Sequence, residues 1–319
     1  MKPFNVIFFV FLVGNLIAQT PEEIFKKVRN QCKTGSIQEY KENTGVIIEI
    51  PVTRGAGIPK KFSLKEFVPE IKQQEGSSCA CYSTAYYGFT TYERYTEKNK
   101  LLPPYDPLYL YARNNVFYNV DDTVDGGTNP MLNLIFLRDY GNPRVESDEF
   151  LTECNDPLAK YPDRLNKWEN LNNNYSNLDK IKYSISSGSP VNVSLSTNFS
   201  FDVYAYKFYL NSELISRDRL VEYLINSEYS ESFNADEIGQ ELDKLNKLNA
   251  GEEYCWSGKP PKENEGSHSV CIIGYDDDKF GGAFEIVNSW GTEWANDGYL
   301  WIKYKDLYKM YPTFYKIGK

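Results

Sequence analysis

The hydrophobic pattern changes along the 319-residue chain, and this change limits the folds that the chain can adopt. From His268 onward, three segments read as β-strands: HSVCIIGY, AFEIVN and YLWIKY. The first half shows helical periodicity instead, most clearly over residues 82–98. The apolar positions of that segment are Tyr82, Ala85, Tyr86 and Phe89. At about 150 residues per domain the length suggests two domains or lobes, and the segregated pattern predicts an α+β fold.

Residues 212–250 predict a helical pair between an expected strand and His268. Asn234 and Glu237 have the spacing of a capping box, and the following apolar residues recur at helical intervals. These are Ile238, Leu242, Leu245 and Leu248, after which Gly251 ends the pattern. The other expected elements are a short helix opening at Thr20–Glu23, a linker over 54–59, a helix over 131–140 ended by Gly141, and a strand over 190–195.

The charge and the single histidine exclude several function classes. Lys and Arg number 35 against 44 Asp and Glu, which gives a net charge of −9. A chain this acidic does not bind nucleic acid through its overall field. One histidine, His268, rules out multi-histidine zinc sites and HExxH metalloproteases. We therefore expect no metal and no cofactor, and any imidazole chemistry must use His268.

The N-terminal segment is typical of a secretory signal peptide. Residues 1–18 carry Lys2 and then a mostly apolar run that ends at Ala18, too short for a membrane-spanning helix. No later stretch is long and apolar enough to span a bilayer. We expect cleavage after Ala18, no stable membrane insertion, and an exported protein that is extracellular or periplasmic.

Two cysteines lie where a polar, glycine-containing loop meets a predicted helix. A helix N-terminus favours a thiolate, which would activate Cys79 as a nucleophile, although a lone cysteine there is more often a buried apolar side chain. Because Cys79 and Cys81 are two residues apart on a helix, their side chains point about 200° apart. Only one of them can face a cleft.

His268 and Asn288 complete a possible nucleophilic triad. Asn288 follows the predicted strand AFEIVN and starts the segment NSWGTEW. An asparagine amide can accept the imidazole N–H and fix its tautomer, and the nearby Trp290 can shield that hydrogen bond from water. Cys, His and Asn therefore occur in the chain order of one known nucleophilic triad.

At this point the sequence resembles the papain-like (C1 family) cysteine peptidases, and more narrowly their secreted bacterial-type branch. The resemblance covers residues 60–319. Three motifs carry it in family order: QQEGSSCACYSTA; Asp125-Gly126-Gly127 followed by a helix ending in Asp139-Tyr140-Gly141; and GSHSVCIIGYDDD with AFEIVNSWGTEWANDGYLWIKY. The resemblance implies a two-lobed fold, with a helical N-terminal lobe carrying the cysteine and an antiparallel, β-barrel-like C-terminal lobe carrying His and Asn.

The resemblance also assigns the site residues. The family places its oxyanion-hole glutamine six residues before the nucleophile, and Gln73 has that spacing to Cys79. Cys81 would have Glu75 there, whose carboxylate would repel an oxyanion, so Cys79 is the expected nucleophile and Cys81 faces the core. His268 becomes the general base and acid, and Asn288 its orienting partner. Trp290 would cover the Asn–His hydrogen bond, while Gly126 and Gly127 would line the substrate cleft.

The implied activity is peptide-bond hydrolysis by a secreted, monomeric endopeptidase acting on protein or peptide substrates. Cys79 and His268 would form a thiolate–imidazolium pair, and catalysis would pass through a thioester acyl-enzyme. The alternative is a catalytically inactive papain-like module that binds peptides or proteins; the intact Gln73, Cys79, His268 and Asn288 argue against it. A transglutaminase-like amidase is a third possibility, but its triad usually ends in Asp.

Several positions depart from the family pattern. Ala80 replaces an aromatic residue, Gly76 and Val124 replace a disulfide pair, and Ala295 replaces a glycine, a change expected to matter little. Residues 19–59 form an N-terminal extension or short pro-segment, and its shortness favours a non-inhibitory role. The helical pair over 212–250 lies where the family chain is usually shorter, and we expect surface decoration rather than a lid or exosite near the cleft. Pairing among Cys32, Cys154 and Cys255 stays open, and Cys271 is expected in the core.

Overall fold

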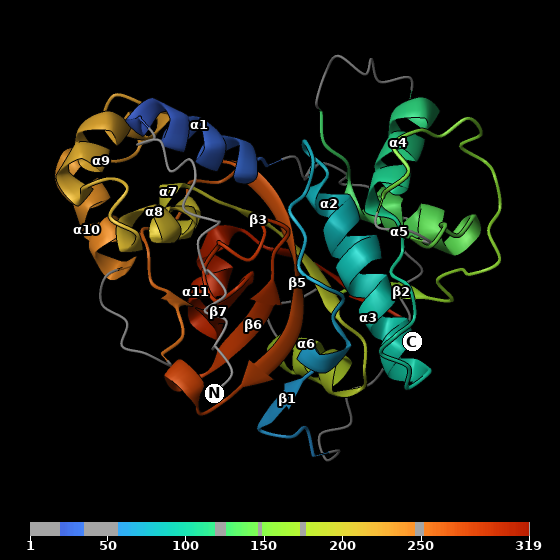
Figure 1. Cartoon of the computed structure of the whole chain (residues 1–319). Coiled ribbons are helices and arrows are strands. Elements are labelled where there is room, and N and C mark those ends of the chain that lie inside the picture. Colours follow the sequence, from blue (N-terminus) through green and yellow to red (C-terminus); the bar gives the residue numbers. More distant parts are fainter. Residues whose placement is uncertain are drawn as a thin grey trace, which may run out of the picture.

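One group of helices lies against one side of the main sheet and further helices lie around the rest of it, a mixed arrangement that agrees with the α+β prediction. The structure is a computed structural model, and it describes residues 20–34, 57–118, 126–145, 149–172, 177–245 and 252–318. In Figure 1 the helices α2 to α5 lie beside the sheet that contains β5, β6 and β7. The mixed fold is therefore confirmed. The predicted signal peptide, residues 1–18, lies outside the described residues.

A continuous helical segment begins at Cys79 and forms the centre of the helical side. It consists of α2 (Cys79–Cys81), the π-helical η2 (Tyr82–Phe89) and α3 (Thr90–Thr96), so the predicted helix starts three residues earlier than its periodicity indicated. All eight residues of η2 are buried. The helices α4 (Pro107–Tyr118) and α5 (Pro130–Asp139) pack against η2.

The described strands form one open sheet in the order β2-β8-β3-β5-β6-β7-β4, with β1 added to β5. The pairings are antiparallel except that of β4 with β7, which is parallel. The end strands of this order, β2 and β4, are not paired with each other, so the sheet is open. The bounds are β1 Lys61–Ser63, β2 Trp168–Asn170, β3 Val191–Ser196, β4 Cys255–Trp256, β5 Ser267–Asp276, β6 Ala283–Val287, β7 Tyr299–Lys303 and β8 Thr313–Ile317.

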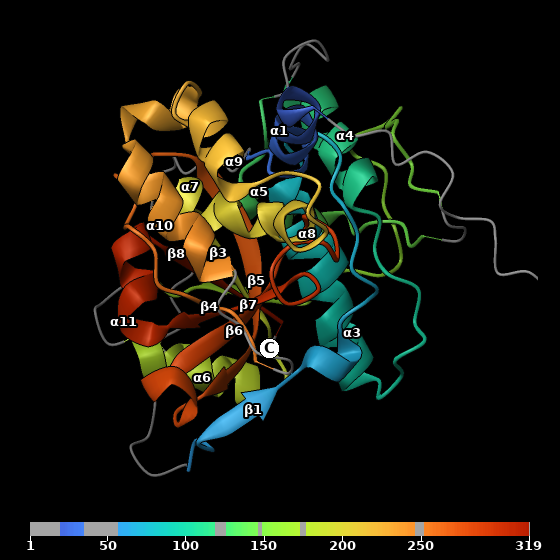
Figure 2. The ribbon, with the colours of Figure 1, turned by 60° about the vertical axis from the view of Figure 1, so that its left-hand side comes forward.

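The remaining helices lie around the sheet. In Figure 2 α1 lies at the top beside α9, and α6 lies near β1 at the bottom. The bounds are α1 Pro21–Gln31, η1 Lys65–Phe67, α6 Asn177–Ser186, α7 Phe199–Asp202, η3 Val203–Tyr206, α8 Lys207–Asn211, α9 Arg217–Leu224, η4 Glu228–Glu231, α10 Ala235–Leu245, η5 Lys279–Gly281, α11 Tyr304–Leu307 and η6 Tyr308–Met310.

The helical pair predicted over 212–250 is confirmed and belongs to the main core. The Asn234 and Glu237 side chains each accept the other residue's backbone N–H at 3.0 Å, which is the capping box expected at the start of α10. Leu220, Leu224, Ile238, Leu242 and Leu245 are buried in the same cluster as the sheet residues. The apolar faces of both helices therefore pack into the main core. Leu248 and Gly251 lie outside the described residues.

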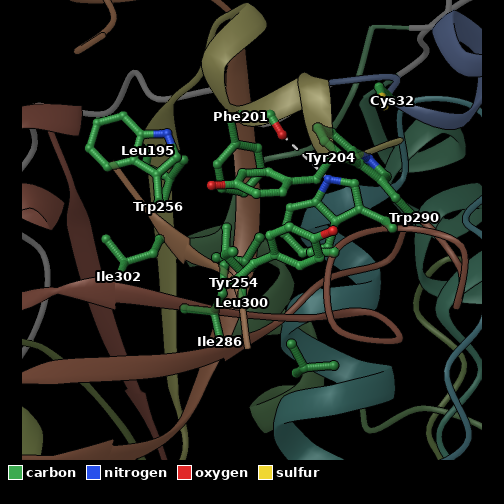
Figure 3. Packing of buried hydrophobic residues seen from close by; sticks show 14 of the residues in the cluster. Cys32, Leu195, Phe201, Tyr204, Tyr254, Trp256, Ile286, Trp290, Leu300 and Ile302 are labelled. Atoms are coloured by element: carbon green, nitrogen blue, oxygen red, sulfur yellow. Dashed lines mark hydrogen bonds between the residues drawn. The ribbon is translucent and has the colours of Figure 1, made fainter. Parts of the chain in front are cut away.

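The main hydrophobic core joins the sheet to the N-terminal helix. Ile24 and Val28 of α1 are fully buried in it. Figure 3 shows part of this core, with the labelled Phe201, Tyr204 and Trp290 side chains close together. A second cluster lies between the central helix and α4 and α5, and it contains Cys81.

The structure also bears on the cysteine pairing that the sequence left open and on the expected absence of a membrane-spanning helix. All six cysteines lie in the described ranges, and no disulfide joins any of them. Cys271 is fully buried in β5, as predicted. Among the described residues, no helix combines the length and hydropathy needed to cross a membrane.

Candidate active site

His268 and Asn288 are hydrogen-bonded to each other in the interior. His268 is the second residue of β5, where it faces Leu195 of β3, and Asn288 directly follows β6. Because β5 and β6 pair with Cys271 opposite Val287, the start of one strand and the end of the other meet at the same edge of the sheet. His268 Nε2 lies 2.8 Å from Asn288 Oδ1. Both residues have no exposed surface.

The backbone of Ser289 determines the direction of this hydrogen bond. Its N–H donates to Asn288 Oδ1 at 2.8 Å, so the side-chain atom facing His268 is the amide oxygen, an acceptor. Nε2 of His268 must therefore carry the proton and donate it. In the neutral ring this leaves Nδ1 with a lone pair, and Nδ1 is buried without a hydrogen-bond partner among the described atoms.

Aromatic side chains isolate the imidazole from water. The Trp290 ring lies over His268 with centroids 4.4 Å apart, and Phe201 packs edge-on against Trp290 at 5.5 Å. Burial lowers the pKa of His268 from 6.5 to about 4, and the hydrogen bond to Asn288 only partly opposes that effect. Near neutral pH the imidazole in this covered site is therefore a neutral base.

Cys79 is the first residue of α2, and α2 packs against β5, the strand that carries His268. Its side chain is fully buried. Cys81, two residues on, belongs to the helical core: its Sγ lies 3.3 Å from Thr128 Oγ1 and accepts a hydrogen bond from Asn133 Nδ2 at 3.5 Å. Burial raises the pKa of Cys81 to about 12, which disfavours its thiolate.

Gln73 lies beside the predicted site but makes a different contact from the one expected of it. Its backbone bridges that of Trp290, and its side chain is exposed. Its Nε2 donates to the carbonyl of Gln31 at 3.0 Å. The donor that the sequence assigned to an oxyanion is thus occupied by a carbonyl of the chain's own N-terminal segment.

Gln74 is a residue that the sequence reasoning missed. It is buried, and its Oε1 accepts from Ser289 Oγ at 2.6 Å while its backbone N–H donates to the Ser289 carbonyl at 2.7 Å. It therefore ties the loop before Cys79 to the residue after Asn288. Only its position next to Gln73 could have signalled this role.

The end of α1 and the residues after it lie on the site. Gln31 Nε2 donates to the Trp290 carbonyl. The carbonyl of Lys33 accepts from Gln74 Nε2 at 3.1 Å and from Trp290 Nε1 at 3.3 Å. The segment therefore covers both Trp290 and the loop before Cys79, and the expected non-inhibitory role of residues 19–59 stays a prediction.

The insertion holds α1 in this place. Phe25 packs against Tyr223 of α9 at 5.2 Å, and Arg29 forms an ion pair with Glu228 of η4 at 2.8 Å. In Figure 1 α1 extends from the region of α9 and α10 toward the start of α2. The helical insertion and the covering segment are thus one structural unit.

Two expected cleft residues lie near the helical core. Gly126 is exposed, and Gly127, half-buried with φ of +70°, has a backbone conformation that glycine adopts readily. They directly precede Thr128, the residue in contact with Cys81. Asp125 and Val124 lie outside the described residues. No group of three or more His, Cys, Asp or Glu side chains in the described ranges is arranged to hold a metal ion.

Comparison with known proteins relates the sequence around His268 and Asn288 to one protein family. Residues 253–311, which contain His268, Asn288 and Trp290, match the model of the papain family cysteine proteases. Searched against curated proteins, the sequence gives no match.

Solved structures extend the likeness over nearly the whole chain. The cysteine protease xylellain from Xylella fastidiosa is 17% identical with a TM-score of 0.58, covering 91% of this chain and 97% of its own. Procathepsin L 3 from Tenebrio molitor larval midgut is 12% identical with a TM-score of 0.60, covering 93% and 79%. ProCathepsin B from Trypanosoma congolense is 11% identical with a TM-score of 0.55, covering 91% and 87%. The resemblance read from the sequence is confirmed: the chain has the papain-like cysteine protease fold, and residues 253–311 match the papain family itself.

Proposed function

We propose that the chain is an exported cysteine endopeptidase in which Cys79 is the nucleophile, His268 the base and acid, and Asn288 the group that orients the imidazole. The observation that supports this most directly is the 2.8 Å hydrogen bond between His268 Nε2 and Asn288 Oδ1, with the amide orientation fixed by Ser289. It leaves Nδ1 as the basic atom of the only histidine in the chain. Export rests on the signal-peptide pattern of residues 1–18.

The reaction follows from these roles. Nδ1 of neutral His268 takes the proton of the Cys79 thiol as sulfur attacks the peptide carbonyl, forming a carbon–sulfur bond and an oxyanion. The Cys79 N–H and the Gln73 amide would stabilise that oxyanion once Gln31 leaves Gln73. The proton on Nδ1 then passes to the leaving amine as the carbon–nitrogen bond breaks. Water, deprotonated by the same atom, hydrolyses the thioester and regenerates the thiol.

Burial changes one part of the expected mechanism. The sequence suggested a resting thiolate–imidazolium pair, but burial holds the pKa of His268 at about 4 in the covered site. Desolvation of this kind favours a neutral thiol and imidazole. We therefore propose that the proton moves to His268 during attack, or after the covering segment leaves and admits water to the site.

The test combines thiol labelling with turnover. Iodoacetamide treatment of the full chain, followed by peptide mapping, is expected to modify Cys79 before Cys81. With a peptide blocked at both ends, His268→Ala and Cys79→Ala should lower kcat by about 10³-fold or more, because the base or nucleophile is lost. The matched control is Cys81→Ser, which should retain turnover if it folds.

Three outcomes would overturn parts of the proposal. Labelling of Cys81 in place of Cys79 would refute the nucleophile assignment. Cleavage only of peptides with a free terminus would refute endopeptidase action. A Cys79 that is labelled readily, in a chain that hydrolyses no peptide, would favour the inactive binding module instead.

A further inference from the structure

A cavity of about 630 Å³ adjoins the candidate site on the side of His268. Ser77, which precedes Cys79 by two residues, and Gly266, which precedes His268 by two, both line it. Neither Gly126 nor Gly127 does. The N-terminal segment forms one wall through Arg29, Cys32 and Lys33.

The body of the protein contributes to the lining a buried carboxylate with an unused oxygen. Asp202 lies at the end of α7, directly after Phe201, the residue packed against Trp290. It lines the cavity and is only 8% exposed. Its Oδ2 accepts from the Tyr229 hydroxyl at 3.0 Å, but its Oδ1 has no hydrogen-bond partner among the described atoms. Because Oδ1 is buried while the segment is in place, it becomes a strong acceptor for a cationic ligand when the cavity opens.

The acidic and basic residues that line the cavity come mostly from different parts of the chain. Its acidic residues all belong to the body of the protein: Asp202, Glu228, Glu231, Glu263 and Glu265. Two of its three cations, Arg29 and Lys33, belong to the covering segment, and only Lys262 comes from the body. Arg29 already pairs with Glu228. When the segment leaves, the cavity therefore loses most of its positive charge and keeps all of its negative charge.

From this arrangement we propose that the cavity is a substrate pocket for a lysine or arginine side chain in the leaving-group half of a peptide, with Asp202 as its principal acceptor. The proposal deepens the proposed function and rests on it. The leaving-group half is indicated because His268 must protonate the leaving amine, and the pocket adjoins His268 rather than Gly126 and Gly127. The covering segment places its own cations in the same pocket that a substrate would use.

The test measures binding without turnover in the full chain. Both proteins carry Cys79→Ala, and Arg29→Glu to weaken the covering segment; one also carries Asp202→Asn. Two fluorescent peptides are compared by anisotropy, identical except for lysine or norleucine at the first two leaving-group positions. We expect the lysine peptide to bind about tenfold more tightly, and Asp202→Asn to remove most of that preference. Asp139→Asn on α5, which is not among the lining residues, is the matched control and should preserve it.

Equal affinity for the two peptides, absence of binding, or a lysine preference that survives Asp202→Asn would each overturn the pocket assignment. Turnover separates this inference from the proposed function. If the parent chain hydrolyses no peptide but binds the lysine peptide through Asp202, the proposed peptidase activity is refuted and the pocket assignment is supported. If both peptides are hydrolysed efficiently at the same rate and Asp202→Asn has no effect, the peptidase activity is supported and the pocket assignment is refuted.

Discussion

Asp202 should make the protein less stable as the pH rises, contrary to the usual effect of a carboxylate. Burial raises the pKa of Asp202 from 3.8 to about 7, the nearby Glu228 and Glu265 add to the increase, and the Tyr229 hydroxyl opposes it. Cys32 and Tyr206 also lie near this carboxyl. The difference between 3.8 and about 7 corresponds to roughly 4 kcal/mol at neutral pH and above.

The sign follows from proton binding in the two states. Below about pH 4 the carboxyl is protonated in both the folded and the unfolded chain, so burial costs no ionisation energy. Between about pH 4 and 7 the unfolded chain releases the proton while the folded chain keeps it, and stability falls as pH rises. Above about pH 7 the folded protein bears the whole penalty. Asparagine does not ionise and can still accept from Tyr229.

Urea unfolding of the parent and of Asp202→Asn at about pH 4, 6 and 8 measures this effect. Relative to the parent, the variant should gain about 2–4 kcal/mol of stability between the lowest and the highest pH. His268 has the opposite slope, because burial lowers its pKa, but both proteins contain it and its effect cancels. A difference that is constant across the pH range, or that moves against the variant with rising pH, would refute an ionisable buried carboxyl at Asp202.

Asp139→Asn is the control of opposite sign. Arg138 lowers the pKa of the Asp139 carboxyl through their hydrogen bonds. That pair therefore adds stability above the ordinary pKa of an aspartate, and the stability is lost as the pH falls. Its removal should destabilise the protein slightly at about pH 8 and less at about pH 4, since exposed pairs contribute little.

Two further changes test the cover and the backbone near the site. Gln31→Ala removes the donor to the Trp290 carbonyl, so the covering segment should open more often and iodoacetamide should label Cys79 several-fold faster. The control is Lys26→Ala, at an exposed position of the same helix. Equal labelling rates in the two variants would contradict a covering role for the segment. Ala295 is fully buried with φ of +45°, a conformation that glycine adopts at lower cost. Ala295→Gly should therefore raise the free energy of unfolding by up to about 1 kcal/mol, and a clear loss in urea titration would show that the lost methyl contacts dominate.

The sequence predicted correctly those structural features that depend on only a few neighbouring residues. The capping box of Asn234 and Glu237 needs only a spacing of three, and it formed as expected. The meeting of His268 and Asn288 needed one more assumption, that two consecutive strands pair as antiparallel neighbours, and this also held. Both features arise from segments of the chain that are close in sequence.

Features that depend on distant segments could not be predicted in this way. Nothing in NFSFDVYAY distinguishes Asp202 from an exposed aspartate, because its burial depends on α1 and the insertion packing around it. The spacing to Cys79 selected Gln73, but it could not show that the Gln31 carbonyl, 42 residues earlier, accepts from its amide. The contacts between the insertion and α1 could not be predicted either, because α1 lies nearly two hundred residues earlier in the chain.

The covering segment and a cationic substrate would compete for the same charges. Glu228 holds the cover through its ion pair with Arg29, and Asp202, the proposed acceptor of a substrate cation, lines the cavity that the cover closes. A ligand that binds only the uncovered form shifts the population toward it by its differential affinity, so a lysine-rich peptide should open the site more effectively than a neutral one. Neutralising Asp202 weakens this selectivity on the substrate side and leaves the Arg29–Glu228 pair in place. The pocket thus determines both how firmly the chain is covered and which peptide uncovers it.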